Sequence, residues 1–474
     1  MSIIGWTSLP TTVIVVYKFL SELLWARYPV FFLPRVLLQT KEADHMKKTN
    51  PASFALKGTV CFSADQTHLC TYDNVYVICE NGRSAGVYPE LPEKFHGIPI
   101  RDTDGALIIP GLTDLHLHAP QYSFRGMHMD LELLDWLNNV TFPEEARYAD
   151  LEYARRAYSI FTDDLRKSAT TRASVFGTLH TDATELLMDL MEKTGLIAFV
   201  GKVNMDRNSP DELREISASV SYEATIRWLE DTAGKYQNIY PILTPRFIPS
   251  CTDKLMSLLA DIQRTYCLPV QSHLSENQGE IAWVKELCPD SAFYGDAYDH
   301  FGLFGGEACP TVMAHCVYSS DEEIALLHKR GVFVAHCPQS NTNLSSGIAP
   351  VRKYLNEGLH IGLGTDIAGG HSLSMLRAIA DAIQVSKLRW RLVDDSLKPL
   401  SLEEAFYMAT MGGGEFFGKV GSFAEGYEFD AVILNDRQLP CPHALTAAER
   451  LERLIYLGEN DCITGKYVSG NKLF

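Results

Sequence analysis

The chain has 474 residues, of which 46% are hydrophobic and 21% are charged, which is the composition of an ordinary globular protein. Its 42 basic and 59 acidic residues give a formal net charge of −17, which argues against nucleic acid or an anionic membrane surface as the main partner. The 11 cysteines include no C-x-x-C pair, so we expect reduced thiols in a cytoplasmic protein rather than a disulfide framework or a zinc ribbon.

Residues 1–50 form a variable N-terminal extension. Its apolar patches are interrupted by Lys18, Glu22 and Arg27, so no stretch approaches the roughly 20 apolar residues of a membrane-spanning helix. We therefore expect no transmembrane segment. Three interpretations stay open: an amphipathic anchor or partner helix, a disordered or loosely packed extension, and a translation start at Met46, which we favour.

The two ends of the remaining chain share one character. Residues 51–106 alternate short strands around turn residues, without obvious helices between them, and residues 426–474 behave similarly. We expect these segments to pair and form one small β-sandwich domain.

Residues 107–425 alternate short apolar runs with amphipathic helical stretches, for example at 211–231 and 321–331. The runs span residues 107–118, 171–180, 197–206, 240–247, 268–276, 311–316, 332–340 and 360–366. Alternating strands and helices predict an α/β fold with parallel strands, and eight such units predict a (β/α)8 TIM-type barrel. A doubly wound open sheet is the alternative fold.

Polar residues gather at the ends of these runs, which form the catalytic face of such a barrel. His116 and His118 lie two residues apart in one strand, so both rings point the same way. His273, His315 and Asp366 end the fifth, sixth and eighth runs. Imidazoles with a carboxylate suit zinc or iron, whereas magnesium and calcium prefer oxygen ligands. The pattern predicts a metal site.

Three other histidines lie near predicted strand ends or loops. We interpret His128 and His180 as structural or rim residues, and His336 as a residue that orients the loop after the seventh strand. The chain contains no phosphate-binding G-x-x-x-x-G-K-[ST], no G-x-G-x-x-G after a strand, no H-E-x-x-H and no G-x-S-x-G.

Six segments of the chain stand out, in chain order PGLTDLHLHAPQYSF, TPRF, QSHLSEN, MAHC, HCPQSNTNLSSG and LGTDIAGG. They resemble motifs of guanine deaminases, which belong to the metal-dependent amidohydrolase superfamily. The histidine pair, the fifth-strand histidine and the G-T-D are typical of the whole superfamily. The segments APQYSF, TFPEEARY, GTLHTD, GKVNMD and TPRF are more specific to guanine deaminases. The resemblance runs from about residue 55 to the C-terminus.

This resemblance implies a hydrolase of C–N bonds in cyclic amidines, which converts guanine to xanthine and ammonia in purine catabolism. A cytoplasmic homodimer is also implied. His116, His118, His273 and Asp366 would bind one zinc ion per chain. Some superfamily members bridge two metals with a lysine on the fourth strand, but this strand ends in TPRF, without a lysine.

The resemblance also implies catalytic roles. Glu276 would carry protons between the attacking water and the purine ring, and His315 would hydrogen-bond that water or the developing oxyanion. Asp366 would accept the proton of the water. The chain departs from the family pattern at Cys316, where many members have glycine.

Substrate contacts follow from the same motifs. Gln121 and Arg246 would hold polar edges of the purine, with Phe247 packing near the ring. The stretch 119–148 is rich in leucine and aromatic residues and is interpreted as a lid that excludes water.

Two alternative functions stay open. One is another amidohydrolase activity, on a different aminated purine, a pterin or a pyrimidine. The other is a non-catalytic scaffold, which the complete set of expected ligands disfavours.

Overall fold

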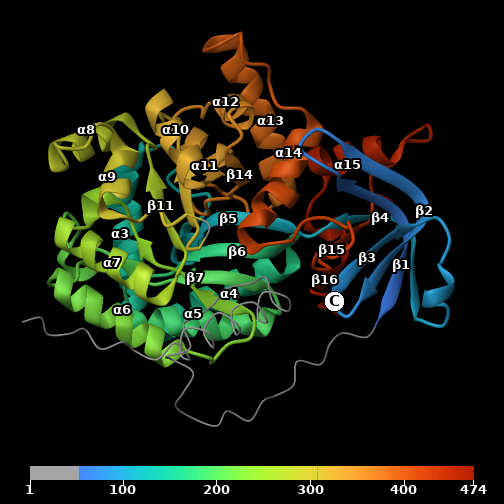
Figure 1. Ribbon diagram of the computed structural model, residues 1–474, viewed down its shortest axis with the longest axis horizontal. Helices are drawn as coiled ribbons and strands as arrows, with labels where there is room; N and C mark the ends of the chain where they lie inside the picture. The colour runs from blue at the N-terminus through green and yellow to red at the C-terminus, as the bar shows by residue number, and fades with distance from the viewer. Residues whose placement is uncertain (1–52, 307) are drawn as a thin grey trace, which may run out of the picture.

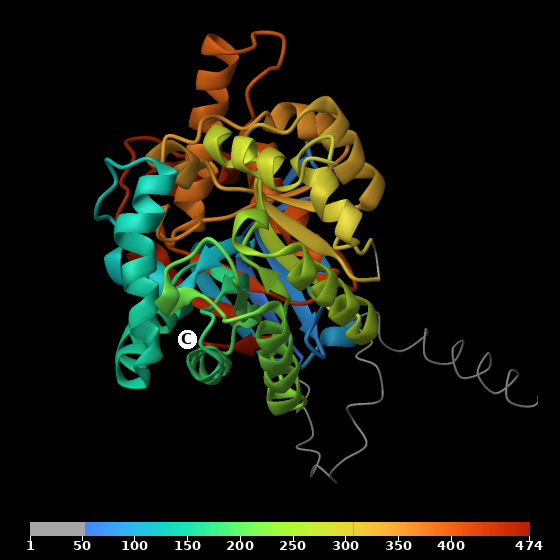
Figure 2. The same ribbon diagram turned by 90° about the vertical axis from the view of Figure 1, so that its left-hand side faces the viewer.

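The computed structural model describes residues 53–306 and 308–474 (Figure 1). Helices surround parallel strands in the larger part of the molecule, and strands from both ends of the chain lie together beside it (Figures 1 and 2). The predictions for residues 1–50 lie outside the described residues.

Parallel strands occupy the centre of the larger part and form two four-stranded sheets and one two-stranded sheet, of β8 (Val203–Asn204) and β10 (Thr244–Pro245). The first sheet consists of β5 (Leu112–His118), β6 (Thr170–Phe176), β7 (Ile197–Gly201) and β9 (Ile239–Pro241). The second consists of β11 (Val270–Leu274), β12 (Thr311–His315), β13 (Phe333–His336) and β14 (His360–Leu363). Each of the eight predicted runs overlaps one of these strands, although β6 and β9 begin one residue before their runs. The strands follow chain order in each sheet, without the reversal of a doubly wound sheet.

Backbone hydrogen bonds connect the two sheets at both margins. At one margin the amide of Gln271 donates to the carbonyl of Leu243 at 2.9 Å. At the other, the amide of His118 donates to the carbonyl of Ile367 at 2.9 Å, and the amide of Asp366 donates to the carbonyl of His116 at 2.8 Å. The carboxyl ends of strands from both sheets are therefore held beside one another.

The helices lie around these strands and follow them along the chain (Figure 2). The longer helices are α4 (Leu151–Lys167), α5 (Thr181–Thr194), α6 (Ala218–Thr232), α7 (Asp253–Tyr266), α8 (Gln278–Leu287), α9 (Tyr294–Phe301), α10 (Asp321–Arg330), α13 (Met375–Leu392) and α15 (Ala447–Leu457). Shorter ones are α2 (Leu133–Trp136), α3 (Phe142–Ala146), α11 (Pro338–Asn343), α12 (Val351–Asn356) and α14 (Leu402–Tyr407). Helix α6 begins later than the predicted stretch 211–231.

Helix α10 shows why local sequence predicts these helices well. The Ser320 side chain accepts a hydrogen bond from the amide of Glu323 and caps the first turn. Three acidic residues occupy the first turn and three basic residues the last, matching the helix dipole. Gly331 ends the helix with a φ of 64°, which glycine adopts without steric cost.

The two ends of the chain form one seven-stranded sheet, in the order β17-β16-β15-β4-β1-β2-β3. Its strands are β1 (Phe54–Ser63), β2 (Leu69–Glu80), β3 (Arg83–Tyr88), β4 (Ile100–Pro110), β15 (Ala431–Leu434), β16 (Ile463–Val468) and β17 (Asn471–Lys472). The predicted pairing of the two terminal segments is confirmed by the antiparallel pair β4 and β15. The strands make a single sheet, so a β-sandwich stays a prediction.

Buried charges lie where this sheet meets the parallel strands. Arg172 of β6 donates to Asp430 at 2.7 and 3.1 Å and to Glu428 at 2.7 Å. The Nζ atom of Lys466 donates to the carbonyls of Ser168 and Thr170 at 2.8 and 2.7 Å. These contacts attach the end of α4 and the start of β6 to the C-terminal strands.

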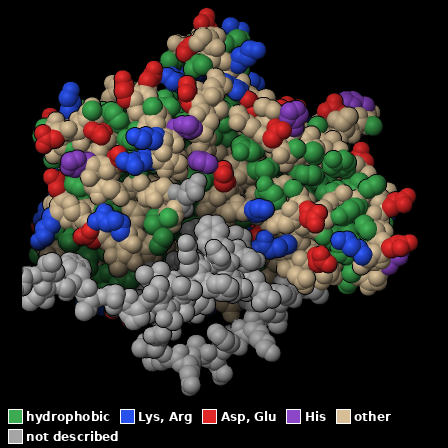
Figure 3. Space-filling model, in the orientation of Figure 1, with side chains coloured by type: hydrophobic (Ala, Val, Ile, Leu, Met, Phe, Trp, Pro, Cys, Tyr) green, Lys and Arg blue, Asp and Glu red, His purple; other side chains and the backbone are tan. Residues whose placement is uncertain are grey.

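All 11 cysteines are free. On the described part of one face, Asp and Glu side chains lie among Lys and Arg side chains (Figure 3). Within residues 53–306 and 308–474, no helix combines the length and apolar character that crossing a bilayer requires.

Candidate metal centre and substrate pocket

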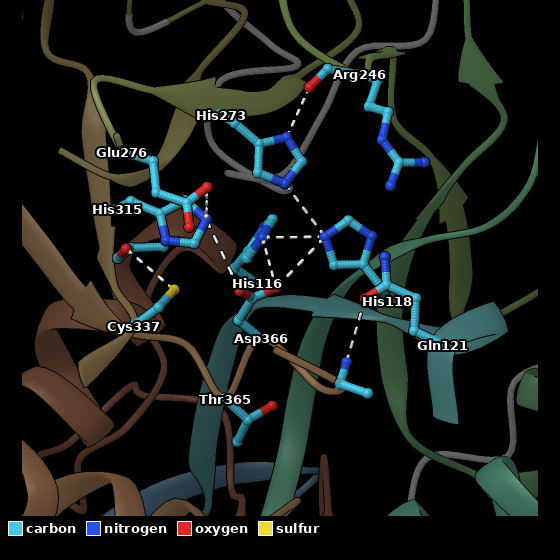
Figure 4. Close-up of polar contacts among 12 residues, drawn as sticks. His116, His118, Gln121, Arg246, His273, Glu276, His315, Cys337, Thr365 and Asp366 are labelled. Atoms are coloured by element: carbon cyan, nitrogen blue, oxygen red, sulfur yellow. Dashed lines mark hydrogen bonds and ion pairs between the residues drawn. The ribbon is translucent and has the colours of Figure 1, made fainter. Parts of the chain in front are cut away.

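Strand ends from both parallel sheets bring the predicted metal ligands together. His116 and His118 lie on β5, His273 lies on β11, His315 ends β12, and Asp366 follows β14. The rings of His116, His118 and His273 and the carboxylate of Asp366 turn toward one another (Figure 4). All of these residues are buried except His273, which is partly exposed.

Distances among these side chains match those between ligands of one metal ion. The Nε2 atoms of His116 and His118 are 3.3 Å apart, and those of His118 and His273 are 3.2 Å apart. The Oδ1 atom of Asp366 lies 3.2 Å from His116 Nε2 and 3.4 Å from His118 Nε2. Two ligand atoms about 2.1 Å from a tetrahedral metal are roughly 3.4 Å apart. These four spacings are those of neighbouring ligands on one metal ion.

The protonation of these groups also suits a metal. His273 donates from Nδ1 to the backbone carbonyl of Arg246 at 2.6 Å, which leaves the lone pair of Nε2 directed at the other histidines. Burial lowers the pKa of His116, His118 and His273, which favours the neutral rings that bind metals. Burial opposes ionisation of Asp366, but the neighbouring histidines, His116 above all, lower the pKa of its carboxyl.

The donor set fits zinc or iron. Within the described residues, the ligand atoms of His116, His118 and His273 lie within 4.8 Å of one another, and those of His116, His315 and Asp366 do the same. Nitrogen donors of this kind suit a borderline ion rather than magnesium or calcium.

Glu276 lies next to these ligands, as the resemblance implied. Its Oε2 atom is 3.4 Å from His315 Nε2, and Ser346 donates to its Oε1 atom at 3.0 Å. Burial raises the pKa of the Glu276 carboxyl. A carboxyl that takes up a proton more readily than an exposed one has the property that a proton carrier needs.

His315 is oriented by Asn341, which was not predicted as a site residue. Its Nδ1 atom donates to Oδ1 of Asn341 at 2.9 Å, so its Nε2 atom faces the carboxylates of Glu276 and Asp366. Burial opposes protonation of His315, but those two carboxylates raise its pKa. The ring can therefore donate a hydrogen bond beside the metal ligands.

Several strand-end residues have left-handed backbone conformations. The φ angle is 49° at Ser275, 73° at His315 and 46° at Asp366. Such conformations cost about 1–3 kcal/mol each and are concentrated at functional sites. Cys316, the departure from the family pattern, has a φ of 48°. The chain thus keeps at this position a backbone that glycine favours, although a cysteine occupies it.

A pocket opens onto these groups. Gln121, Arg246 and Phe247 line it together with the predicted catalytic residues. The predicted lid, 119–148, contributes three apolar side chains, Leu133, Trp136 and Leu137. The pocket therefore combines fixed polar groups with apolar walls, an arrangement that suits a small flat heterocycle.

Glu145, which was not predicted, joins the two expected purine contacts. Its carboxylate accepts hydrogen bonds from Arg246 at 2.5 and 3.2 Å and from Nε2 of Gln121 at 2.9 Å. All three side chains are buried. Glu145 belongs to the TFPEEARY segment, so the family resemblance was the only sequence signal for it.

Glu280 is a second carboxyl that was not predicted, and it also lines the pocket. It accepts a hydrogen bond from the hydroxyl of Tyr294 at 2.7 Å and forms a capping box with Asn277 at the start of α8. Burial and the neighbouring Glu276 raise its pKa to about 7. The capping-box spacing N-x-x-E could have identified its structural role from the sequence.

The remaining histidines stand apart from the ligand cluster. His128 is exposed and His180 occupies the position before α5, in agreement with structural or rim roles. His336 is buried, and in the described part of the chain neither ring nitrogen has a hydrogen-bond partner. No hydrogen bond of its ring supports the predicted role in orienting the following loop.

Comparison with known proteins identifies the family. Residues 107–473 match the model of the amidohydrolase family. The guanine deaminase of Dictyostelium discoideum is 41% identical over 382 residues, which cover 78% of this chain and 83% of that protein. A crystal structure of guanine deaminase from C. acetobutylicum with bound guanine is 48% identical, has a TM-score of 0.86, and is matched over 89% of this chain and 100% of that one.

A more distant structure shares the fold alone. An adenosine deaminase from Xanthomonas campestris with bound zinc is 22% identical, with a TM-score of 0.74 over 89% of this chain and 92% of that one. The family match and the identities to guanine deaminases lead to one conclusion: this chain belongs to the amidohydrolase family, within its guanine deaminase group.

Proposed function

We propose that this protein is a guanine deaminase, which hydrolyses guanine to xanthine and ammonia in purine catabolism. The observation that carries the proposal is the pocket that Gln121 and Arg246 share with His118, His273 and Asp366. The similarity to a guanine deaminase structure containing guanine supports the same substrate.

In this proposal His116, His118, His273 and Asp366 hold one zinc ion per chain. Their mutual distances of 3.2–3.4 Å support the assignment. When bound, zinc lowers the pKa of a water molecule toward about 7 and supplies a hydroxide nucleophile at neutral pH.

Glu276, Asp366 and His315 handle the protons. Hydrolytic deamination requires a proton on the ring nitrogen next to the reacting carbon, and a second proton on the leaving amine. Glu276 carries the first proton from the attacking water to the ring nitrogen, since its buried carboxyl faces the pocket and is held by Ser346. Asp366 accepts the other proton of that water, which Glu276 then passes to the leaving amine, and His315 hydrogen-bonds the water. Proton transfer of this kind contributes about 10²–10⁴-fold to the rate.

Gln121 and Arg246 bind the polar edge of the purine, and Phe247 packs near the ring. A guanidinium offers a planar fork of donors that a lysine cannot reproduce. A site whose polar groups each pair with the substrate rejects analogues that lack those groups. Leu133, Trp136 and Leu137 exclude water from the bound ring.

The first experiment is to incubate the purified, zinc-supplemented protein with guanine. Conversion to xanthine is followed by ultraviolet absorbance, and the released ammonia is measured. We expect a chelator to abolish turnover and added zinc to restore it. Zinc-bound protein without guanine turnover would contradict the substrate, and a panel of aminated purines, pterins and pyrimidines would then identify the activity.

We further propose that residues 107–425 close into a (β/α)8 barrel, with 51–106 and 426–474 forming a small β-sandwich and 1–50 a variable extension. The backbone hydrogen bonds at both sheet margins support the closure. We propose a cytoplasmic homodimer, which light scattering can test, since the mass of a single chain would contradict it.

A further inference from the structure

We propose that Glu145 is a positioning residue that sets substrate specificity by fixing the orientations of Gln121 and Arg246. The inference rests on the proposed function and deepens it. Guanine carries a lactam, that is, an N–H donor beside a carbonyl acceptor, which adenine and 2-aminopurine lack. We infer that Glu145 prepares the pocket for this lactam edge.

Arg246 is held from two sides. Both Nη atoms of its guanidinium donate to the Glu145 carboxylate, at 2.5 and 3.2 Å. The ring of Phe142, which lies on the same short helix as Glu145, is 5.1 Å from the guanidinium carbon. A two-pronged ion pair and a ring contact together fix the plane of the guanidinium. Its remaining N–H groups therefore have a fixed direction.

The side-chain amide of Gln121 is oriented just as firmly. A carboxylate can only accept, so the amide nitrogen must face Glu145, at 2.9 Å. The backbone amide of Ala368 can only donate, so the amide oxygen must face it, at 3.3 Å. Both hydrogen bonds therefore require the same orientation of the Gln121 side-chain amide. Gln121 keeps one N–H and one oxygen lone pair, which are complementary to the carbonyl and N–H of a lactam.

The charges of Arg246 and Glu145 also support a positioning role for Glu145. Arg246 and Glu145 are 3% and 2% exposed, so without the carboxylate a cation would be buried without a counterion. The two charges together make a neutral environment, which suits a neutral base. The adjacent Glu144 contacts Arg147 and Tyr153 instead and does not line the pocket. Glu144 therefore offers a matched control on the same helix.

The test compares Glu145→Gln with Glu144→Gln on two substrates. One is guanine, and the other is 2-aminopurine, which has the same exocyclic amine but no lactam. For Glu145→Gln we expect kcat/KM for guanine to fall about 30-fold or more, mainly through KM, and kcat/KM for 2-aminopurine to fall less than about threefold. The zinc content of Glu145→Gln should stay at the wild-type level, and Glu144→Gln should keep the wild-type preference.

Parallel losses on both substrates would mean a merely structural role and would overturn the inference, as would an unchanged preference. Absence of guanine turnover in the wild-type protein would instead refute the proposed function, and this inference with it. If Glu145→Gln does not fold, Glu145→Asp provides the test, because it keeps the charge but is too short to reach both partners. We expect its preference for guanine to fall about threefold or more, and an unchanged preference would again overturn the inference.

Discussion

The predicted metal-ligand cluster (His116, His118, His273 and Asp366) and the junction between the parallel strands and the seven-stranded sheet both bury ionisable groups. The two places differ in what interacts with those groups. At the junction, the chain itself supplies the partners. Arg172 meets the carboxylates of Asp430 and Glu428, and Lys466 meets backbone carbonyls. Because breaking a buried ion pair is costly, such contacts stabilise one arrangement of the two parts.

The metal-ligand cluster has the opposite character. The Nε2 atoms of His116, His118 and His273 converge with a carboxylate oxygen of Asp366. Because His273 donates from Nδ1 to a backbone carbonyl, its Nε2 atom is an acceptor that faces this group. An arrangement of this kind needs a cation from outside the chain. Buried groups that are already paired within the chain therefore indicate a structural role, whereas converging ligand atoms indicate a bound cation.

The Glu145–Arg246 pair combines both characters. The two side chains form an ion pair within the chain, as the charges at the junction do. Arg246 also lines the pocket, together with His118, His273 and Asp366. Its predicted effect on specificity is therefore the sharpest test of whether a paired buried charge can also serve function.

The largest expected effect is the loss of one ligand. We expect His273→Ala to lose its zinc and to lower kcat/KM by about 10³-fold or more, because Lewis-acid catalysis is worth several kcal/mol. The junction is intact in this variant, so the protein should remain folded. Metal analysis and circular dichroism provide the measurements, and full zinc occupancy would refute the ligand role.

The next effect separates proton transfer from metal binding. Glu276→Gln keeps the size of the side chain but cannot carry a proton. We expect zinc content to match the wild type while kcat falls about 10²–10⁴-fold. Wild-type activity at equal zinc content would contradict the assignment.

At the junction we expect a loss of stability rather than of chemistry. Arg172→Met leaves Asp430 buried without its partner, which should lower the free energy of unfolding by about 3–5 kcal/mol. Denaturant unfolding measures this, and kcat per folded, zinc-loaded molecule should not change. Lys167→Met, which removes an exposed ion pair on α4, is the control and should change stability little. A loss of kcat per folded, zinc-loaded molecule in Arg172→Met would contradict a purely structural role for the junction.

The smallest expected effect is a pH dependence at the same junction. Burial opposes ionisation of Glu428, but Arg172 lowers its pKa below the ordinary value of 4.5. Folding therefore favours the carboxylate, so this contribution to stability is present above pH 4.5 and is lost as the pH falls through the lower folded-state pKa. Compared with Glu428→Gln, the wild type should lose about 1 kcal/mol or less over this range. If the free energy of unfolding depended on pH identically in the wild type and in Glu428→Gln, the assigned contribution of Glu428 would be contradicted.

Much of the fold could be predicted because its signals are local. The apolar runs predicted the eight strands of the two four-stranded sheets, and α10 carries its cap, its charges and its terminal glycine within twelve neighbouring residues. The helical stretch predicted at 211–231 was less accurate, because the helix begins later than predicted. Residues 211–213 form a separate turn, and Ser217 caps a helix that begins at Ala218. Two signals for the start of a helix, one near residue 211 and one at Ser217, lie close together there.

The chemistry of the site could be predicted from the sequence, because histidines and an aspartate that end neighbouring parallel strands lie at one face of a barrel. The hydrogen-bond partners of the site's side chains became evident from the tertiary structure alone. Glu145 meets Arg246 across 101 positions of chain, and Ser346 meets Glu276 across 70. Such pairs depend on how distant segments pack, and hydrophobic periodicity carries no information about which buried polar groups will face each other.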